Sequence, residues 1–352
     1  RDRRGAKGGM TVSDEIVDVL VIGSGASGGA FAWRLSKEPG IKVACLEQGD
    51  WPQPRYNPSA DTDYQYQSLI TPPAPQGVNH LRDGYPYDHS ESIWQPGMYN
   101  GVGGSTVHYE AGFTRCHPSD FKVRTVSGVA DDWPISYQDL EPYYDQNERM
   151  MGLSGLAGNP SNPPRSPVPL PPPMMGRGPQ IFINAFEKLG WHWWISSRVL
   201  VTEPYGEGRL PCNYRCASCG AGCYRKAKGS TDVVYWPEAI RNGVILKTRA
   251  RVREIVVGED GLAEGALYYD EQGQLHEQKA RLVVVACNGI GTPRLLLNST
   301  SSQFPEGLSN SSGLVGKNLM SHCIAHVVGV SESVNSYDNG LRGGGVSSQQ
   351  FY

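Results

Sequence analysis

Short apolar runs rich in β-branched residues are the clearest pattern along this 352-residue chain. The runs at 16–22, 42–46 and 282–286 are nearly continuous, which is typical of strands buried on both faces of a parallel sheet. A glycine-rich turn and a helical segment separate the first two runs. Residues 17–49 therefore predict a strand, a turn, a helix and a second strand, in the order of a βαβ unit.

Strand-like patterning returns in the last third of the chain. Segments 244–257, 262–270 and 274–287 are separated by turns at 259–261 and 272–273. They lead into the last parallel strand, 282–286. This order predicts an antiparallel meander laid over a doubly wound parallel sheet, an α/β fold.

The middle of the chain predicts helices and connections. Residues 134–151 predict a helix that begins after the capping residue Ser136, and 179–189 predict another. The proline-rich stretch 158–173 should be extended and connect two subdomains. The tryptophans in 191–194 should begin a strand, and they suit core packing better than a substrate platform.

Charge and hydropathy exclude several classes of protein. The formal net charge is −3 and neither sign is gathered into long runs, so we expect no nucleic-acid partner. No apolar stretch approaches the roughly 20 residues needed to cross a bilayer. The N-terminus also lacks the apolar core of a secretory signal, so a cytoplasmic location is expected. Residues 1–14 are expected to form a tail.

Glycines follow the first predicted strand at the spacing of a dinucleotide-binding turn. Gly23 begins the turn, Gly25 leaves room for a pyrophosphate, and Gly28 lets the helix pack on the strand. The phosphates would lie at the helix N-terminus, where N–H groups and the helix dipole favour negative charge. Glu47, at the end of the second strand, should accept hydrogen bonds from the adenosine ribose. The residues predicted to bind the dinucleotide here are Gly23, Gly25, Ala26, Ser27, Gly28 and Glu47.

Two further segments predict contacts with the same cofactor. In GVGGSTVHY at 101–109, Gly103 and Gly104 permit close backbone approach, while Ser105 and Thr106 offer hydroxyl and N–H groups. After the last parallel strand, a turn through Gly289, Gly291, Thr292 and Pro293 should lead into a helix over 294–298. Gly291 and Thr292 would then stand at a second positively polarised helix start.

Four cysteines crowd into twelve residues: Cys212, Cys216, Cys219 and Cys223. Their spacing nearly reproduces a bacterial iron–sulfur sequence, although the first gap is one residue longer and Tyr224 stands where proline would follow. Three interpretations remain open: an iron–sulfur cluster, a structural zinc ion, or thiols that fix the loop without a metal.

Together, the βαβ unit, GVGGSTVHY and ACNGIGTPRLLLNS at 286–299 resemble the glucose-methanol-choline (GMC) oxidoreductases in order and interval. GLVGKNLMSH at 313–322 agrees as well, and KAKGSTDVVYWPEAI at 226–240 is similar to bacterial members with a cysteine-rich insertion. The resemblance covers about residues 15–330. It implies an FAD-binding domain from 15–134 and 212–321, and an incomplete α+β substrate domain from 135–211 and 322–352.

Two single residues gain a role from this resemblance alone. Val252 matches the family position whose backbone contacts adenine. His108 matches a position where several members attach the flavin covalently and others bind it without a bond, and both alternatives stay open here. The chain departs from the second family signature at Asn288 and Gly289, where glycine and a small residue are more typical.

The resemblance implies oxidation of an alcohol or sugar CH–OH group by hydride transfer to flavin N5, with electrons passed to an external acceptor. In the family a histidine near the C-terminus accepts the hydroxyl proton, and no segment here matches it. His322 and His326 belong to a different segment, so no catalytic residue is assigned and the chain is expected to be inactive alone. The alternatives are another flavoprotein, such as an NAD-linked reductase, and a noncatalytic flavin- or metal-binding electron-transfer or interaction module.

Overall fold

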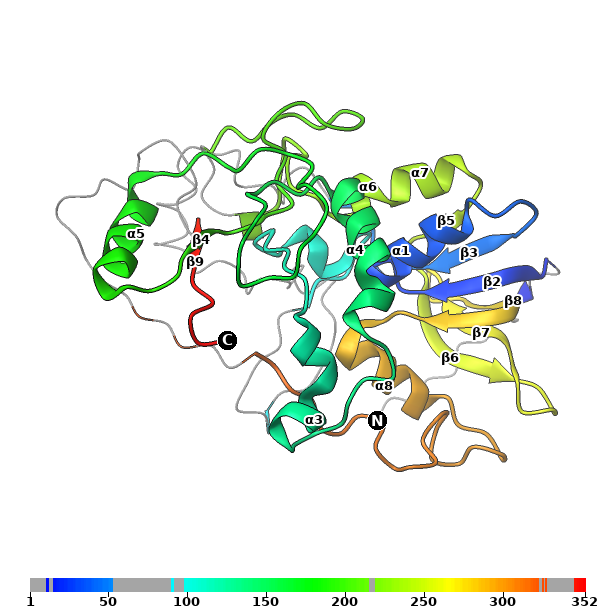
Figure 1. Cartoon of the computed structure of the whole chain (residues 1–352). Helices are drawn as coiled ribbons and strands as arrows, with labels where there is room; N and C mark the ends of the chain where they lie inside the picture. Colours follow the sequence, from blue (N-terminus) through cyan, green and yellow to red (C-terminus); the bar gives the residue numbers. More distant parts are fainter. Residues whose placement is uncertain are drawn as a thin grey trace. The chain divides into compact units, whose positions relative to one another are not determined.

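The computed structural model describes residues 11–12, 15–52, 90–91, 98–214, 219–322, 325, 327 and 345–352. These residues form two compact units (Figure 1). The first unit is built from the described residues up to 52, from 90–108 and from 230–325. The second is built from 109–229, 327 and 345–352.

A seven-stranded, mostly parallel sheet forms the first unit. Its strands lie in the order β5 (Ile245–Lys247), β3 (Val43–Leu46), β2 (Val17–Ile22), β8 (Leu275–Val285), β7 (Ala263–Tyr269) and β6 (Arg251–Val257). The short strand β1 (Thr11–Val12) also pairs with β8. The mixed α/β fold with a parallel core, expected from the sequence, is confirmed.

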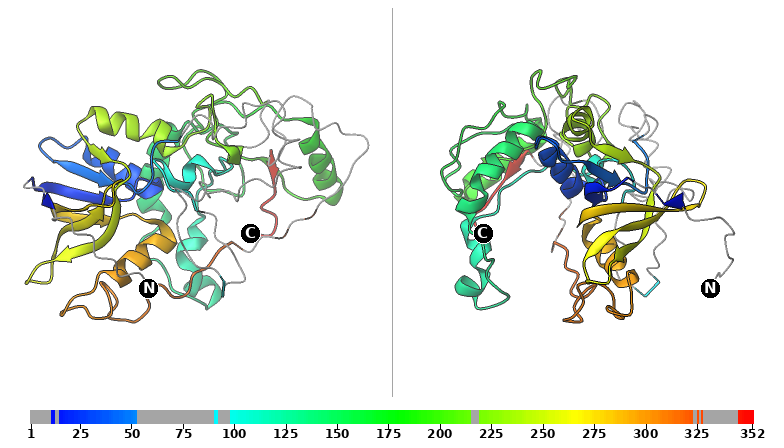
Figure 2. Two further views of the ribbon diagram at one scale, coloured as in Figure 1. Left: turned by 180° about the vertical axis from the view of Figure 1, so that it is seen from behind. Right: turned by 90° about the vertical axis from the view of Figure 1, so that its right-hand side faces the viewer.

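The antiparallel meander is continuous with the parallel sheet, because β8 serves both. Residues 275–279 pair antiparallel with β7, whereas 280–285 pair parallel with β2. Figures 1 and 2 show β6, β7 and β8 side by side, with α8 (Asn288–Asn298) next to β6. The strand expected at 282–286 is therefore the second half of one long strand, and the meander is joined to the parallel sheet through its first half.

The first part of the expected meander segment 244–257 belongs to the parallel sheet instead. Residues 245–247 form β5 and pair in parallel with β3, so that Cys45 lies opposite Leu246. The short helices α6 (Thr231–Val234) and α7 (Trp236–Arg241) directly precede β5 and supply the crossover that a parallel connection needs.

The core of the first unit joins the sheet to the meander. Leu20 and Ile22 of β2 pack in one apolar cluster with Ile255 of β6 and Leu295 of α8. On the other face, α1 (Ala26–Leu35) buries Ala32 and Trp33 and contacts β2 and β3. β2 and β3 are therefore buried on both faces, as their unbroken apolar runs predicted. The same prediction was wrong for the run at 282–286, because Leu282 of β8 is 54% exposed and Val283–Val285 are only partly buried.

The second unit contains the two predicted helices. α4 (Tyr137–Met151) begins after Ser136, whose side chain accepts a hydrogen bond from the Asp139 N–H, and α5 is Arg177–Leu189. The other elements are α3 (Val123–Ser127), the short 3₁₀ helices η4 (Pro118–Lys122) and η5 (Cys219–Ala221), and strands β4 (Trp194–Ile195) and β9 (Val346–Ser347), which pair antiparallel.

The boundary between the units differs from the expected one. Residues 109–134 and 212–229 were expected in the cofactor domain, but they lie in the second unit. Polar contacts explain this: the Tyr109 hydroxyl donates to the Gly229 carbonyl at 2.6 Å, and the Lys228 ammonium donates to the Tyr109 carbonyl at 3.0 Å.

Candidate functional site

A tight glycine turn connects β2 to α1 as predicted. Gly23 has a φ of +96°, a conformation that L side chains rarely adopt, and it ends β2. A Cβ built on Gly28 would lie 1.9 Å from the Gly23 carbonyl oxygen, so the helix is packed directly on the turn. Ala26 and Ser27 are exposed at the first turn of the helix. The N–H groups at this helix end have no intrahelical acceptor, which suits an anion.

The second glycine segment touches the first. The Gly103 N–H donates to the Ser24 carbonyl at 3.2 Å. A Cβ on Gly104 would lie 2.7 Å from the Gly25 Cα, so the two backbones are as close as glycine allows. Residues about 80 positions apart therefore form one surface beside the start of α1.

Side chains in the second segment take different roles. Ser105 is exposed on the 3₁₀ helix η3 (Gly104–Val107). The Thr106 hydroxyl instead donates to the Gly103 carbonyl at 2.5 Å and accepts the Thr231 N–H at 3.1 Å. Ser105 is thus placed to offer its hydroxyl outward, while Thr106 holds the shape of the segment.

Glu47 is buried behind the glycine turn, with 6% of its surface exposed. Its Oε2 accepts the Ser24 N–H at 2.9 Å and the Ser24 hydroxyl at 2.6 Å, and its Oε1 accepts the Gly49 N–H at 2.9 Å. Burial raises the pKa of this carboxyl, while the hydrogen bonds from Ser24 and Gly49 partly oppose the shift. Glu47, which the sequence predicted to bind the ribose, therefore also stabilises the turn through these hydrogen bonds.

His108 follows η3 directly and is half-buried. Its N–H donates to the Ser105 carbonyl at 3.1 Å, and its ring lies edge-on to Tyr99 with 4.5 Å between centroids. The contact with Tyr99 fixes the orientation of the imidazole relative to the second glycine segment.

Val252 lies in β6 with 9% of its surface exposed, and its side chain joins the apolar cluster under the sheet. Only its backbone remains for a ligand, which agrees with the backbone role that the resemblance implies. Its register partner is Tyr268 of β7.

The helix near Gly291 and Thr292 begins earlier than expected. α8 starts at Asn288, whose side-chain oxygen accepts the N–H groups of Ile290 and Gly291 at 2.9 and 3.0 Å. The helix continues through Pro293, so the predicted start at 294 was wrong. Gly291 is buried inside the helix, and the Thr292 hydroxyl accepts the Cys287 N–H at 3.2 Å.

The described cysteines of the clustered group lie in the second unit. Cys212, Cys219 and Cys223 pack against an apolar cluster that includes Leu200 and Val201. The Cys212 sulfur accepts the Tyr214 N–H and the Cys223 sulfur accepts the Lys228 N–H, each at 3.4 Å. Cys216 lies outside the described residues.

No group of three or more His, Cys, Asp or Glu side chains among the described residues is arranged to hold a metal ion. The described part of the chain therefore gives no support to an iron–sulfur cluster or to a zinc site. The six cysteines found as free thiols there include Cys212, Cys219 and Cys223.

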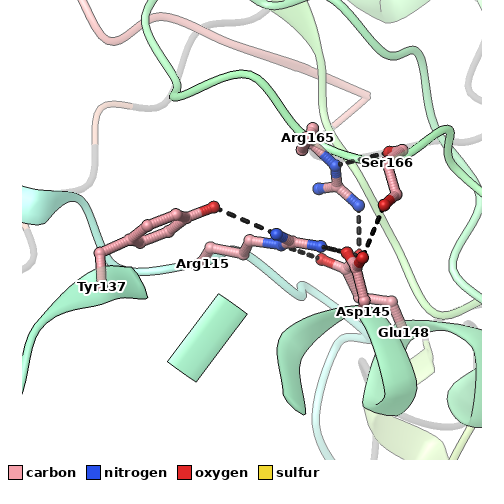
Figure 3. Close-up of polar contacts among 6 residues, drawn as sticks. All are labelled: Arg115, Tyr137, Asp145, Glu148, Arg165 and Ser166. Carbon is pink, nitrogen blue, oxygen red and sulfur yellow. Dashed lines mark hydrogen bonds and ion pairs between the residues drawn. The ribbon is translucent and has the colours of Figure 1, made fainter. Parts of the chain in front are cut away.

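A charged cluster in the second unit links α4 to two distant segments (Figure 3). Arg115 donates to Glu148 through Nε at 2.8 Å and Nη2 at 2.7 Å, to the Tyr137 hydroxyl at 3.1 Å, and to Asp145. Arg165 also donates to Glu148. Burial tends to lower the pKa of Arg115, but its hydrogen bonds to Glu148, Tyr137 and Asp145 hold that pKa above its usual range.

Three residues of this cluster, Arg115, Tyr137 and Arg165, line a cavity of about 1030 Å³ in the second unit. The cavity is also lined by Asn162, Trp194 and Gln349. The two guanidinium groups and two carboxylates of the cluster balance in formal charge and form ion pairs with one another. The cluster therefore holds this side of the cavity in place.

Sequence reasoning missed Ser24, Thr231 and Trp236. The Trp236 indole N–H donates to the Ser24 carbonyl at 2.8 Å, and Thr231 contacts both glycine segments. Ser24 lies within the first glycine turn, and Thr231 and Trp236 lie within the segment 226–240. No pattern in the sequence indicated that these residues contact one another or the second glycine segment.

Three comparisons bear on identity. The family model for "GMC oxidoreductase" matches residues 17–324. The chain is 39% identical over 349 residues to 2-methyl-1,2-propanediol dehydrogenase of Mycolicibacterium austroafricanum, a match that covers 97% of this chain and 62% of the relative. It is 31% identical over 331 residues to the fructose dehydrogenase large subunit of Gluconobacter japonicus, covering 87% of this chain and 58% of that protein. The chain thus spans about three fifths of the length of these relatives.

Solved structures share the fold at low sequence identity. Pyridoxine 4-oxidase from Mesorbium loti superposes with a TM-score of 0.50 and 20% identity, covering 80% of this chain and 52% of its own. Formate oxidase from Aspergillus oryzae, solved in a study of FAD modification, gives a TM-score of 0.51 at 13% identity, covering 81% and 48%. These structures share the fold, and the family match over residues 17–324 identifies the chain as a member of the GMC oxidoreductase family.

Proposed function

We propose that this chain binds FAD and forms the cofactor-binding part of an oxidoreductase that acts on the CH–OH group of an alcohol or sugar. The observation that carries the proposal is the meeting of the two glycine segments, Gly23–Gly28 and Gly103–Thr106, at the exposed N-terminus of α1. A dinucleotide phosphate needs such a place, where backbone N–H groups can be approached without a side chain in the way.

The cradle fits FAD on the chemistry of its residues. A Cβ on Gly25 would meet nothing closer than the Gly104 Cα at 3.8 Å, so the surface in front of the turn is open. The N–H groups at the helix start would take the pyrophosphate, and Glu47 would accept a ribose hydroxyl. Ser105, His108, Gly291 and Thr292 would lie along the rest of the cofactor, and the Val252 backbone would face adenine.

The reaction class follows from the family and its relatives. FAD supplies the hydride acceptor when it is bound. The chain's residues would bind and orient that cofactor, and electrons would leave to an external acceptor, as the word dehydrogenase in the names of the two relatives suggests. We assign no proton acceptor to this chain, and we do not extend the proposal to a metal.

The compartment of the protein is supported by fewer observations than its cofactor. None of the helices in the described part of the chain is long and apolar enough to cross a membrane. The cytoplasmic location expected from the sequence stays a prediction.

A visible spectrum of the purified chain, before and after acid precipitation, tests the proposal. We expect flavin absorption in the folded protein. Release of the flavin into the supernatant would indicate noncovalent binding, and retention in the pellet would indicate attachment at His108. A folded chain that is colourless and takes up no added FAD would overturn the proposal.

A further inference from the structure

The back of the dinucleotide turn is held by a segment more than 200 positions away. The Ser24 carbonyl accepts the Trp236 indole N–H at 2.8 Å and the Gly103 N–H at 3.2 Å. Trp236 is fully buried, with 0% of its surface exposed. A buried indole N–H is a costly group to leave without a partner, so this hydrogen bond defines where the carbonyl points.

The other side of Ser24 is fixed as well. Its N–H and its hydroxyl both donate to Glu47 Oε2, at 2.9 and 2.6 Å. The two peptide groups that flank Ser24 therefore each have a buried anchor: Glu47 for the group shared with Gly23, and Trp236 for the group shared with Gly25.

Peptide geometry gives these anchors a consequence for the ligand side. In a trans peptide the C=O and the following N–H point in opposite directions. The described residues contain no cis peptide bond. Holding the Ser24 carbonyl against Trp236 therefore directs the Gly25 N–H away from the core, toward the exposed start of α1.

Thr231, on the same segment as Trp236, connects the second glycine segment. Its N–H donates to the Thr106 hydroxyl at 3.1 Å. Its own hydroxyl lies 3.3 Å from the Gly103 carbonyl and 3.4 Å from the Gly25 carbonyl. Residues 231–236 thus contact both glycine segments on the side that faces the core.

We infer that Trp236, supported by Thr231, is a positioning residue that sets the direction of the Gly25 N–H toward the FAD pyrophosphate. The inference rests on the proposed function, because it assigns the Gly25 N–H to that ligand. Trp236 itself does not touch the cofactor: it acts through the Ser24 peptide group.

A pair of buried tryptophans provides a matched test. Trp236→Phe removes the indole N–H behind the turn. Trp33→Phe removes the N–H of a second buried indole in the same unit, which donates to Glu238 Oε2 at 2.7 Å rather than to a carbonyl of the turn. For each variant, FAD affinity is measured by titration of the flavin-free chain, and the unfolding midpoint of the flavin-free chain is measured separately.

We expect Trp236→Phe to bind FAD roughly tenfold more weakly than the native chain, about the effect of one lost hydrogen bond. Trp33→Phe should bind FAD as the native chain does, even if its unfolding midpoint falls equally. Equal FAD affinity in Trp236→Phe and the native chain, or equal loss in both variants, would overturn the inference.

Thr231→Val keeps the test decisive if Trp236→Phe does not fold. It removes the hydroxyl at nearly constant volume, and we expect a smaller but measurable loss of FAD affinity because its contacts are longer. Native affinity in this variant would then overturn the inference. Failure of the native chain itself to bind FAD would refute the proposed function instead, so the two failures are distinguishable.

Discussion

Two alanine substitutions three residues apart in the glycine turn, Gly28→Ala and Gly25→Ala, are expected to affect different properties, the first folding and the second FAD binding. In Gly28→Ala the new Cβ would lie 1.9 Å from the Gly23 carbonyl oxygen and 3.3 Å from the Val21 side chain. The first distance is more than an ångström too short, and the atom in the way is backbone. In Gly25→Ala the nearest atom is the Gly104 Cα at 3.8 Å, an ordinary contact.

The magnitudes follow from this geometry. Overpacking usually costs about 1–3 kcal/mol, and Gly28→Ala should reach at least the upper end, since the gain of roughly 1 kcal/mol from replacing a helical glycine by alanine offsets only part of it. Gly25→Ala changes the residue that precedes α1, where alanine costs about 1 kcal/mol or less. Its methyl group would stand in the open surface that we assign to the pyrophosphate.

Urea unfolding of the flavin-free chain and a separate FAD titration distinguish the two effects. We expect Gly28→Ala to lose about 3 kcal/mol or more of its unfolding free energy, and Gly25→Ala to fold almost normally while binding FAD at least tenfold more weakly. A Gly28→Ala chain with native stability would refute the steric reasoning. Native FAD affinity in Gly25→Ala would refute the assignment of the turn to the pyrophosphate.

The remaining predictions concern buried carboxylates. Glu148→Gln should lower the unfolding free energy by about 3–5 kcal/mol, because Arg115 and Arg165 would lose a shared buried anion. Glu187→Gln, a substitution at an exposed position, is the control. Equal losses of unfolding free energy in the two variants, measured by urea unfolding, would contradict this prediction. Burial raises the pKa of Glu47, so its contribution to stability is fully present below the ordinary glutamate pKa of about 4.3 and is lost as the pH rises through the raised value. Glu47→Gln should remove that part of the decline in unfolding free energy, and an unchanged pH profile would show that Glu47 does not titrate as inferred.

Local patterns predicted the elements whose signals are local. The β2 turn, the start of α4 after Ser136, and the end of α5 at Leu189 each follow from a few neighbouring residues, and the structure confirms them. The sequence predicted that both glycine segments contact one cofactor, but it gave no signal for the direct contact between them that the structure shows.

Other features depend on partners distant in sequence. Residues 245–247 have the composition of a strand in any sheet, and only pairing with β3 places them in the parallel one. α8 begins at Asn288 because its side chain caps the first turn, so Gly289–Pro293, expected as a turn before the helix, form its first part. The role of Trp236 depends on a contact across 212 positions, for which periodicity gives no signal.

The most direct test of the central claim is a calorimetric titration of the flavin-free chain with FAD and, in parallel, with FMN. FMN carries the flavin and one phosphate but lacks the adenosine that Glu47 and the Val252 backbone are proposed to bind. We expect one FAD per chain and an affinity for FMN weaker by roughly tenfold or more, the effect of one or more lost hydrogen bonds. Equal affinity for both flavins, or no binding of FAD by the folded chain, would contradict it.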